Sequence, residues 1–159
     1  MGFGFFYDMP IGQIFIAEDG IGINKVTLAG DINEEDLKKY TMEETKLIKE
    51  TAGQLREYFE GIRKEFTISL NPQGSSFQKK VWEALLQIPY GETRSYKEIA
   101  QIIGNKKAAR AVGMANHNNP IMCIIPCHRV IGSDGSLIGY RGGIEIKVKL
   151  LQLEKSERK

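Results

Sequence analysis

Cysteine and histidine are scarce in this sequence, which contains two of each among its 159 residues. Cys123 and Cys127 lie four positions apart in one apolar run, an arrangement that is neither a disulfide framework nor a tetrahedral zinc set. The spacing Cys-x-x-x-Cys-His also fails to match the haem-attachment sequence, Cys-x-x-Cys-His. We therefore expect reduced thiols, no metal and no cofactor.

Long hydrophobic runs are missing as well. Charged residues interrupt every apolar segment before it reaches the roughly 18 residues that a membrane-spanning helix needs. Asp8 falls where a signal peptide would need apolar residues, and no basic region precedes it. We expect a cytoplasmic protein without a membrane segment. Its net charge of +2 is small, so any contact with nucleic acid must come from a local surface.

Turn-forming residues gather in the sequence NPQGSS at residues 71–76, which predicts a linker there. The chain, with 42% hydrophobic residues, is long enough to bury a core on each side of this linker. We therefore predict an α+β protein with an N-terminal domain at residues 1–70 and a C-terminal domain at residues 77–159.

Alternating apolar residues and glycine punctuation predict a small sheet in the N-terminal domain. The expected strands are residues 5–7, 13–17, 23–28 and 66–70. Thr41 and Glu44 have the spacing of a capping box and should begin one amphipathic helix. Apolar residues at helical spacing follow, and Gly61 should end this helix.

The C-terminal domain is predicted to be mainly helical. An apolar stripe from Phe77 to Ile88 indicates one helix, and Ser95 with Glu98 forms a capping box for a second, which Gly104 should end. A third helix, rich in alanine and glycine, should start near Lys106. Two short helices joined by a tight turn resemble a helix-turn-helix, and a face of small residues suits DNA recognition by shape rather than by base edges.

Cys127, His128 and Arg129 follow one another directly after a β-like apolar run at residues 121–125. A cysteine attacks as its thiolate, which a neighbouring base favours, so His128 is the expected base for Cys127. In extended chain the two side chains point to opposite faces, so His128 is expected to reach Cys127 through a water or a backbone turn rather than directly. Glu154, late in a terminal helix, could orient the imidazole. Cys123 lies inside the apolar run and is expected in the core.

The segments IPCHRVI, SDGSLIGYRGG and IKVKLLQLE resemble the O6-alkylguanine-DNA alkyltransferase family. The resemblance extends to GETRSYKEIA and KKAARAVGMANHNNP and covers about residues 77–154, whereas the first 70 residues are similar only in size and pattern. It implies a ribonuclease H-like N-terminal domain and a winged-helix-like C-terminal domain with the helix-turn-helix.

The resemblance also implies a reaction. Cys127 would accept the alkyl group from O6-alkylguanine in duplex DNA, with O4-alkylthymine as a second candidate substrate, and would be consumed in one irreversible event. His128 would act as the base through water, Glu154 would orient it, and Asn119 would support the turn of the active site.

The target atom is stacked inside the duplex, so the nucleotide must be flipped out. The resemblance assigns this step to Arg110, as a finger that fills the gap, and to Tyr96, which crowds the phosphate and protonates the guanine. The other implied residues are Val130, Tyr140, Arg141 and Gly142 around the base, and Lys97, Asn116 and Ser133 as further DNA contacts. A monomer is the default expectation.

Two other readings remain open. A protein that only binds alkyl lesions would keep the helix-turn-helix without needing an acceptor cysteine. A cysteine hydrolase would use the same three residues, Cys127, His128 and Glu154, but would release its covalent intermediate and turn over.

Overall fold

The computed structural model describes residues 2–137 and 143–156. The chain divides into two compact units. The first unit contains Met1–Gln73 and Pro120–Met122, and the second contains Gly74–Asn119 and Cys123–Lys159. Among the described residues, no helix is both long enough and apolar enough to cross a bilayer.

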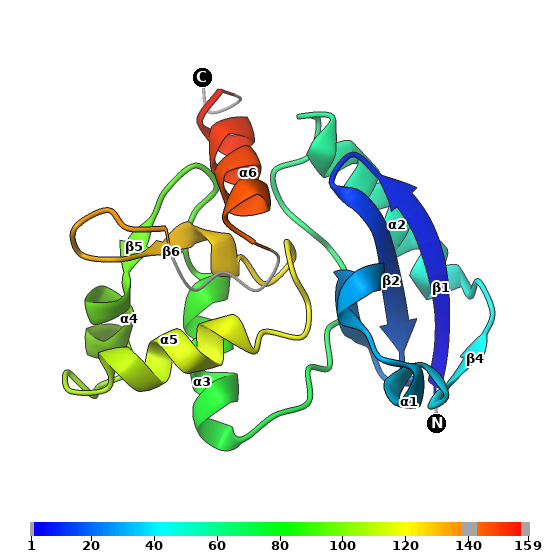
Figure 1. The fold of residues 1–159 in the computed structure, drawn as a ribbon, viewed down its shortest axis with the longest axis horizontal. Helices are drawn as coiled ribbons and strands as arrows, with labels where there is room; N and C mark the ends of the chain where they lie inside the picture. The colour runs from blue at the N-terminus through cyan, green and yellow to red at the C-terminus, as the bar shows by residue number, and fades with distance from the viewer. Residues whose placement is uncertain (1, 138–142, 157–159) are drawn as a thin grey trace. The chain divides into compact units, whose positions relative to one another are not determined.

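The first unit is built on a four-stranded sheet of order β3-β2-β1-β4. Its strands are β1 (Gly2–Met9), β2 (Gly12–Glu18), β3 (Ile23–Leu28) and β4 (Tyr40–Met42). The first three form an antiparallel meander, and β4 pairs in parallel with β1 (Figure 1). A 3-10 turn (η1, Ala29–Asp31) and a one-turn helix (α1, Glu34–Leu37) precede β4. The predicted strands at residues 5–7, 13–17 and 23–28 are confirmed.

The expected strand at residues 66–70 is wrong. This segment is irregular and touches the sheet only through a bridge between Leu70 and Ile23. Gly22, just before β3, lies so close to it that a Cβ there would be 2.9 Å from the carbonyl oxygen of Ser69. The segment therefore ends against the start of β3, whereas β4, which the sequence analysis did not find, pairs with β1 at the opposite edge of the sheet.

Helix α2 (Lys46–Phe59) packs against β1 and β2 (Figure 1). Ile48, Ala52 and Leu55 are buried, as the apolar spacing predicted. The spacing also predicted Phe59, but Tyr58 is buried there and Phe59 is only partly buried. Gly61 follows the helix with φ of +78°, the left-handed geometry that ends many helices. The predicted start is wrong, because Thr41 is in β4 and Thr45 caps the helix by accepting from the amide of Ile48.

The second unit contains the predicted helices. Helix α3 (Ser76–Leu86) begins with a capping box of Ser75 and Gln78, and α4 (Tyr96–Ile102) begins with the expected one of Ser95 and Glu98. Gly104 ends α4 with φ of +83°. Helix α5 (Ala109–His117) contacts both α3 and α4 (Figure 1).

Two features after residue 104 differ from the prediction. Helix α5 begins at Ala109 rather than near Lys106, because residues 106–107 form a turn. The run at residues 121–125 is buried, but it is not a strand: Cys123 has φ of +70° and the chain turns there. This turn leads into η2 (Cys127–Arg129), a 3-10 helix.

Three further elements complete the described part of the second unit. Strand β6 (Val130–Ile131) follows η2 and pairs in parallel with β5 (Arg94–Ser95), directly before α4. Helix α6 (Ile144–Ser156) contacts η2. The nucleophile candidate is therefore held between the start of the helix-turn-helix and the terminal helix.

Candidate active site

Cys127 begins the 3-10 turn η2 and is only 2% exposed. Its carbonyl oxygen accepts a hydrogen bond from the amide of Val130, which closes the turn, and another from Nδ2 of Asn116 at 3.2 Å. The thiol is therefore presented by a short turn that is fixed from α5. A buried thiol on a fixed turn suits a nucleophile that acts on one bound group rather than a general redox cysteine.

The imidazole of His128 is fully buried and lies against α6. Its Nε2 is 2.6 Å from Oε2 of Glu154. The structure has a 3-10 turn around Cys127 and His128 rather than extended chain, and this turn brings the histidine directly onto the terminal helix. Glu154 therefore does reach back to the histidine, although 26 residues separate them along the chain.

Arg129 binds the same carboxylate and was not singled out from the sequence. Its Nε donates to Oε1 of Glu154 at 2.8 Å, and its Nη2 donates to Oε2 at 3.0 Å. Nη1 donates to the carbonyl oxygen of Ile88 at 2.7 Å, and the guanidinium lies over the ring of Tyr90. A two-point contact of this kind fixes both the position and the charge of a carboxylate.

The charge states of this cluster follow from its burial and its partners. Burial alone raises the pKa of Glu154, but hydrogen bonds and positive charge from His128 and Arg129 outweigh it and lower that pKa well below its ordinary value. Burial lowers the pKa of His128 against the opposing effect of Glu154. A neutral imidazole beside an ionised carboxylate donates from Nε2, so Nδ1 is the basic nitrogen.

Asn119 and Cys123 shape the segment that leads to the nucleophile. Nδ2 of Asn119 donates to the carbonyl oxygen of Ile125 at 2.8 Å, and Asn119 is 5% exposed. Cys123 is buried, as predicted, and burial raises the pKa of its thiol. Cys123 is therefore a protonated core residue, in contrast to the cysteine on the turn.

Tyr96 is the first residue of α4 and is half-buried. Burial raises the pKa of its hydroxyl, negative charge on Cys127 raises it further, and a hydrogen bond with Asn116 lowers it. The raised pKa keeps this phenol protonated at neutral pH. It is suited to donate a proton at the site.

The predicted DNA contacts divide into two groups. Arg110, Lys97 and Ser133 are exposed, and Arg110 is the second residue of α5. Asn116 is 1% exposed, so the prediction of a surface contact there is wrong. Its amide is used inside the protein, where it supports the carbonyl of Cys127.

Of the four residues expected around the base, one lies in the described part of the chain. Val130 is buried beside the nucleophile turn, whereas Tyr140, Arg141 and Gly142 lie outside the described residues. Lys147 of α6, which the sequence analysis did not single out, is fully buried and donates from Nζ to the carbonyl oxygen of Val130 at 2.6 Å. Its burial could not be predicted from the sequence, because a lysine in a helix is usually exposed.

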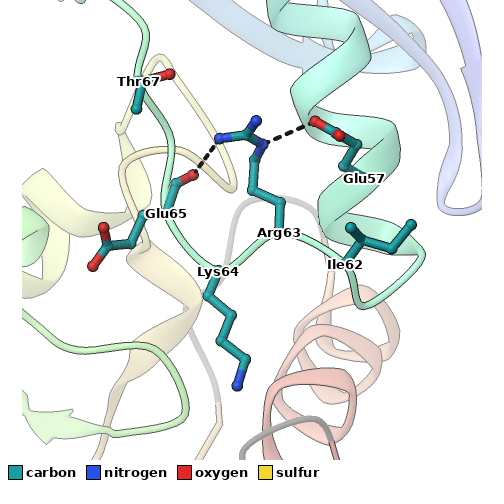
Figure 2. Close-up of a pocket in the computed structure, with 6 residues that line it drawn as sticks. All are labelled: Glu57, Ile62, Arg63, Lys64, Glu65 and Thr67. Atoms are coloured by element: carbon teal, nitrogen blue, oxygen red, sulfur yellow. Dashed lines mark hydrogen bonds and ion pairs between the residues drawn. The ribbon is translucent and has the colours of Figure 1, made fainter.

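A separate surface hollow of about 450 Å³ lies in the first unit. Arg63 points there between the carboxylate of Glu57 and the carbonyl of Glu65 (Figure 2). The hollow contains none of the residues singled out above. Within the described ranges, no group of three or more His, Cys, Asp or Glu side chains could hold a metal ion.

Comparison with known protein families finds a match for each of the two domains. The model for the 6-O-methylguanine DNA methyltransferase DNA binding domain matches residues 76–156, and the model for the ribonuclease-like domain of the same enzyme matches residues 5–72. The methylated-DNA–protein-cysteine methyltransferase of Methanosarcina acetivorans is 48% identical over 150 residues, which are 94% of this chain and 96% of that protein.

Solved structures agree with these matches. The O6-methylguanine methyltransferase of Mycobacterium tuberculosis is 46% identical, with a TM-score of 0.92 over 99% of this chain and 94% of the other. The same enzyme in complex with DNA gives 45% identity and a TM-score of 0.89, over 97% and 93% of the two chains. The predicted α+β fold, with a ribonuclease-like sheet domain and a helical DNA-binding domain, is confirmed. The chain belongs to the 6-O-methylguanine DNA methyltransferase family.

Proposed function

We propose that this DNA-repair methyltransferase moves the alkyl group of O6-alkylguanine in duplex DNA onto the thiol of Cys127 and is consumed in the process. The observation that carries the proposal is the buried series from Cys127 through His128 to Glu154. It supplies a nucleophile, a neutral base and a fixed anion within one turn and one helix. The DNA complex of a relative that is 45% identical supports duplex DNA as the partner.

The reaction would begin with loss of the thiol proton. Nδ1 of His128 accepts this proton through a water molecule, while Glu154 stabilises the resulting imidazolium. The thiolate then attacks the alkyl carbon in line with the bond to O6. The new S–C bond forms as the C–O6 bond breaks, and the electron pair remains on guanine. Proton donation from Tyr96 to the guanine ring would make it a better leaving group.

The product explains why one protein repairs one lesion. A thioether on Cys127 has no acyl carbon for water to attack, so the bond formed in the transfer is not hydrolysed. This chemistry separates the proposal from a cysteine hydrolase, which regenerates its thiol. It also separates it from a protein that only binds lesions, which would leave Cys127 unchanged.

Access to the stacked base would require flipping. We propose that Arg110 on α5 enters the space of the flipped nucleotide, with Lys97 and Ser133 contacting the DNA backbone. The exposed position of Arg110 in the first turn of α5 supports this role. Val130, with Tyr140, Arg141 and Gly142, would surround the base, and O4-alkylthymine is a second substrate to test. The protein would act as a monomer.

The site of modification tests the proposal. The protein is incubated with a duplex that carries one O6-methylguanine, and intact mass is followed by peptide mapping. Wild type and Cys123→Ser should each gain one methylene, on Cys127, and Cys127→Ser should gain none. A wild-type protein that binds the duplex but stays unmodified would instead be a protein that only binds alkyl lesions.

The flipping step has its own test. Arg110→Ala should slow methyl transfer from duplex DNA at least about tenfold, since unstacking a base costs a few kcal/mol and tenfold corresponds to about 1.4 kcal/mol. Transfer from the free base O6-methylguanine should be unchanged. Lys80→Ala, on the exposed side of α3, is the matched loss of charge. Equal slowing with both substrates would remove Arg110 from the flipping step.

A further inference from the structure

Asn116 is a buried amide on α5 that contacts the nucleophile turn. It is 1% exposed and shares the buried face of the helix with Val112 and Ala115. Its Nδ2 donates to the carbonyl oxygen of Cys127 at 3.2 Å. A backbone carbonyl can only accept a hydrogen bond, so this contact fixes the orientation of the amide, with its NH2 group towards η2.

Tyr96 lies against the same helix. The Cδ1 and Cε1 atoms of its ring are 3.8 Å from the position that a Cβ would take at Gly113. Asn116 follows Gly113 by three residues, so the two positions are neighbours on one side of α5. Strand β5 ends directly before Tyr96 and pairs with β6, which begins directly after η2. Tyr96 is therefore held near both Asn116 and the nucleophile turn.

The hydrogen bond between Asn116 and Tyr96 has a defined direction. Burial raises the pKa of the Tyr96 hydroxyl, whereas this hydrogen bond lowers it, which is the effect of a donor that stabilises the phenolate. The NH2 group of Asn116 carries two hydrogens, one for the carbonyl oxygen of Cys127 and one for the phenolic oxygen. Oδ1 of Asn116 is buried and, among the described residues, accepts no hydrogen bond, as expected when both neighbours use the NH2 end. The phenolic oxygen accepts in this contact, so its own hydrogen points away from Asn116.

The turn of α5 that carries Asn116 is also fixed without this amide. Nε1 of Trp82, on α3, donates to the carbonyl oxygen of Ala115 at 2.9 Å. This carbonyl belongs to the last turn of α5, where helix carbonyls lack an amide partner within the helix. Asn116 can therefore be replaced without loss of the contact that holds its own turn.

We propose that Asn116 is the positioning residue that makes Tyr96 a proton donor to the flipped guanine. Its amide holds the phenolic oxygen as an acceptor and leaves the O–H bond directed at the substrate. During transfer the phenolic proton moves to the guanine ring as the C–O6 bond breaks, and the electron pair of the O–H bond stays on Tyr96 as a phenolate. The amide of Asn116 stabilises this phenolate. This role rests on the proposed function, because it concerns the step in which guanine leaves.

The first test compares two methyl donors. Methyl transfer to Cys127 is measured in a single turnover from a saturating duplex that carries O6-methylguanine, and separately from iodomethane, whose iodide leaves without a proton. Asn116→Leu should slow transfer from the duplex at least about tenfold, because the general acid loses its orientation. It should leave methylation by iodomethane unchanged. Asn118→Leu, at an exposed neighbouring position, is the matched control and should change neither rate.

Two outcomes of this comparison would overturn the inference. Equal slowing with both donors would mean that Asn116 acts only on the nucleophile turn, and no slowing with the duplex would mean that it does not act on the transfer. Absence of transfer by wild type, with iodomethane still reacting at Cys127, would instead be a failure of the proposed function.

A double variant tests whether Asn116 acts through Tyr96. Asn116→Leu should slow transfer from the duplex no further in a protein that already carries Tyr96→Phe, because the two changes remove one and the same effect. Losses that multiply would mean that the two residues act separately, which contradicts the proposed role.

NMR of the protein alone decides the direction of the hydrogen bond if Asn116→Leu does not fold. The two Nδ2 hydrogens of Asn116 are compared between wild type and Tyr96→Phe. One of them should move to lower chemical shift in Tyr96→Phe, whereas the one bound to the carbonyl of Cys127 should keep its shift. Two unchanged hydrogens overturn the inference.

Discussion

Glu154 accepts a hydrogen bond from His128 at 2.6 Å while Arg129 binds both oxygens of the same carboxylate. The amide of Gly91 adds a fourth donor at 3.1 Å. The base of the site therefore rests on an anion whose position is fixed from three directions. This arrangement ties activity and stability to one side chain.

Replacing Glu154 by glutamine keeps the shape of the side chain but leaves Arg129 buried without its anion. Removing one partner of a buried ion pair costs about 3–5 kcal/mol of unfolding free energy. We expect a loss of this size in urea unfolding, together with slower methyl transfer. Glu83→Gln, on an exposed part of α3, should change neither quantity. Equal stability of the two variants would contradict the account of this cluster.

The free energy of unfolding should fall in two stages as the pH decreases. The pKa of His128 is lowered from 6.5 in the folded protein, so the unfolded chain takes up a proton first as the pH falls. Stability from this residue is complete above about pH 6.5 and is lost below it. Glu154, with its pKa lowered from 4.5, adds a second loss below about pH 4.5.

Variants of the two histidines can show which residue causes the first loss of stability. Urea unfolding between pH 8 and pH 5 should show a decline in wild type and in His117→Gln, whose histidine is exposed. The decline should be much smaller in His128→Gln. A full decline in His128→Gln would mean that another group takes up the proton.

Asn119 and its neighbour Asn118 form a matched pair. Asn119 is buried and donates to the carbonyl of Ile125, whereas Asn118 is exposed. Asn119→Ala should lower the free energy of unfolding by about 1–3 kcal/mol, the cost of leaving a buried carbonyl without its donor. Asn118→Ala should stay within about 0.5 kcal/mol of wild type. Thermal or urea unfolding compares the two directly.

The start of α2 is testable in the same way. Thr45 caps this helix and also donates to the carboxylate of Glu18. Thr45→Ala should cost about 1 kcal/mol of unfolding free energy, the usual value for a lost cap. Thr41→Ala, in the exposed part of β4, should cost less. The reverse order would support the start that the sequence suggested.

The helices were predictable because each carries a local signal. Apolar spacing located α2 and α3, and the capping box of Ser95 and Glu98 fixed the start of α4. Where a sequence pattern was compatible with two structures, contacts with distant parts of the chain decided which one forms. Thr41 and Glu44 satisfy the spacing of a cap, but β4 pairs with β1 and draws Thr41 into the sheet. The apolar run before Cys127 has the composition of a strand, yet it turns at Cys123.

The residues of the site were predictable where they are neighbours in the sequence. Cys127 and His128 stand together in the sequence, and their roles stay predictions until the reaction is measured. The supporting residues were harder to find, because burial of a polar side chain depends on partners far along the chain. Asn116 was predicted as a DNA contact, and Arg129 and Lys147 were given no role in the site. All three are buried by contacts that only the fold creates.

Stoichiometry tests the central claim most directly. The protein is mixed with increasing amounts of duplex that carries radiolabelled O6-methylguanine, and protein-bound label is measured at completion. The account predicts a plateau at one methyl group per protein, with excess lesions left in the DNA and no further repair on longer incubation. Repair that continues beyond one lesion per protein would contradict irreversible transfer to Cys127.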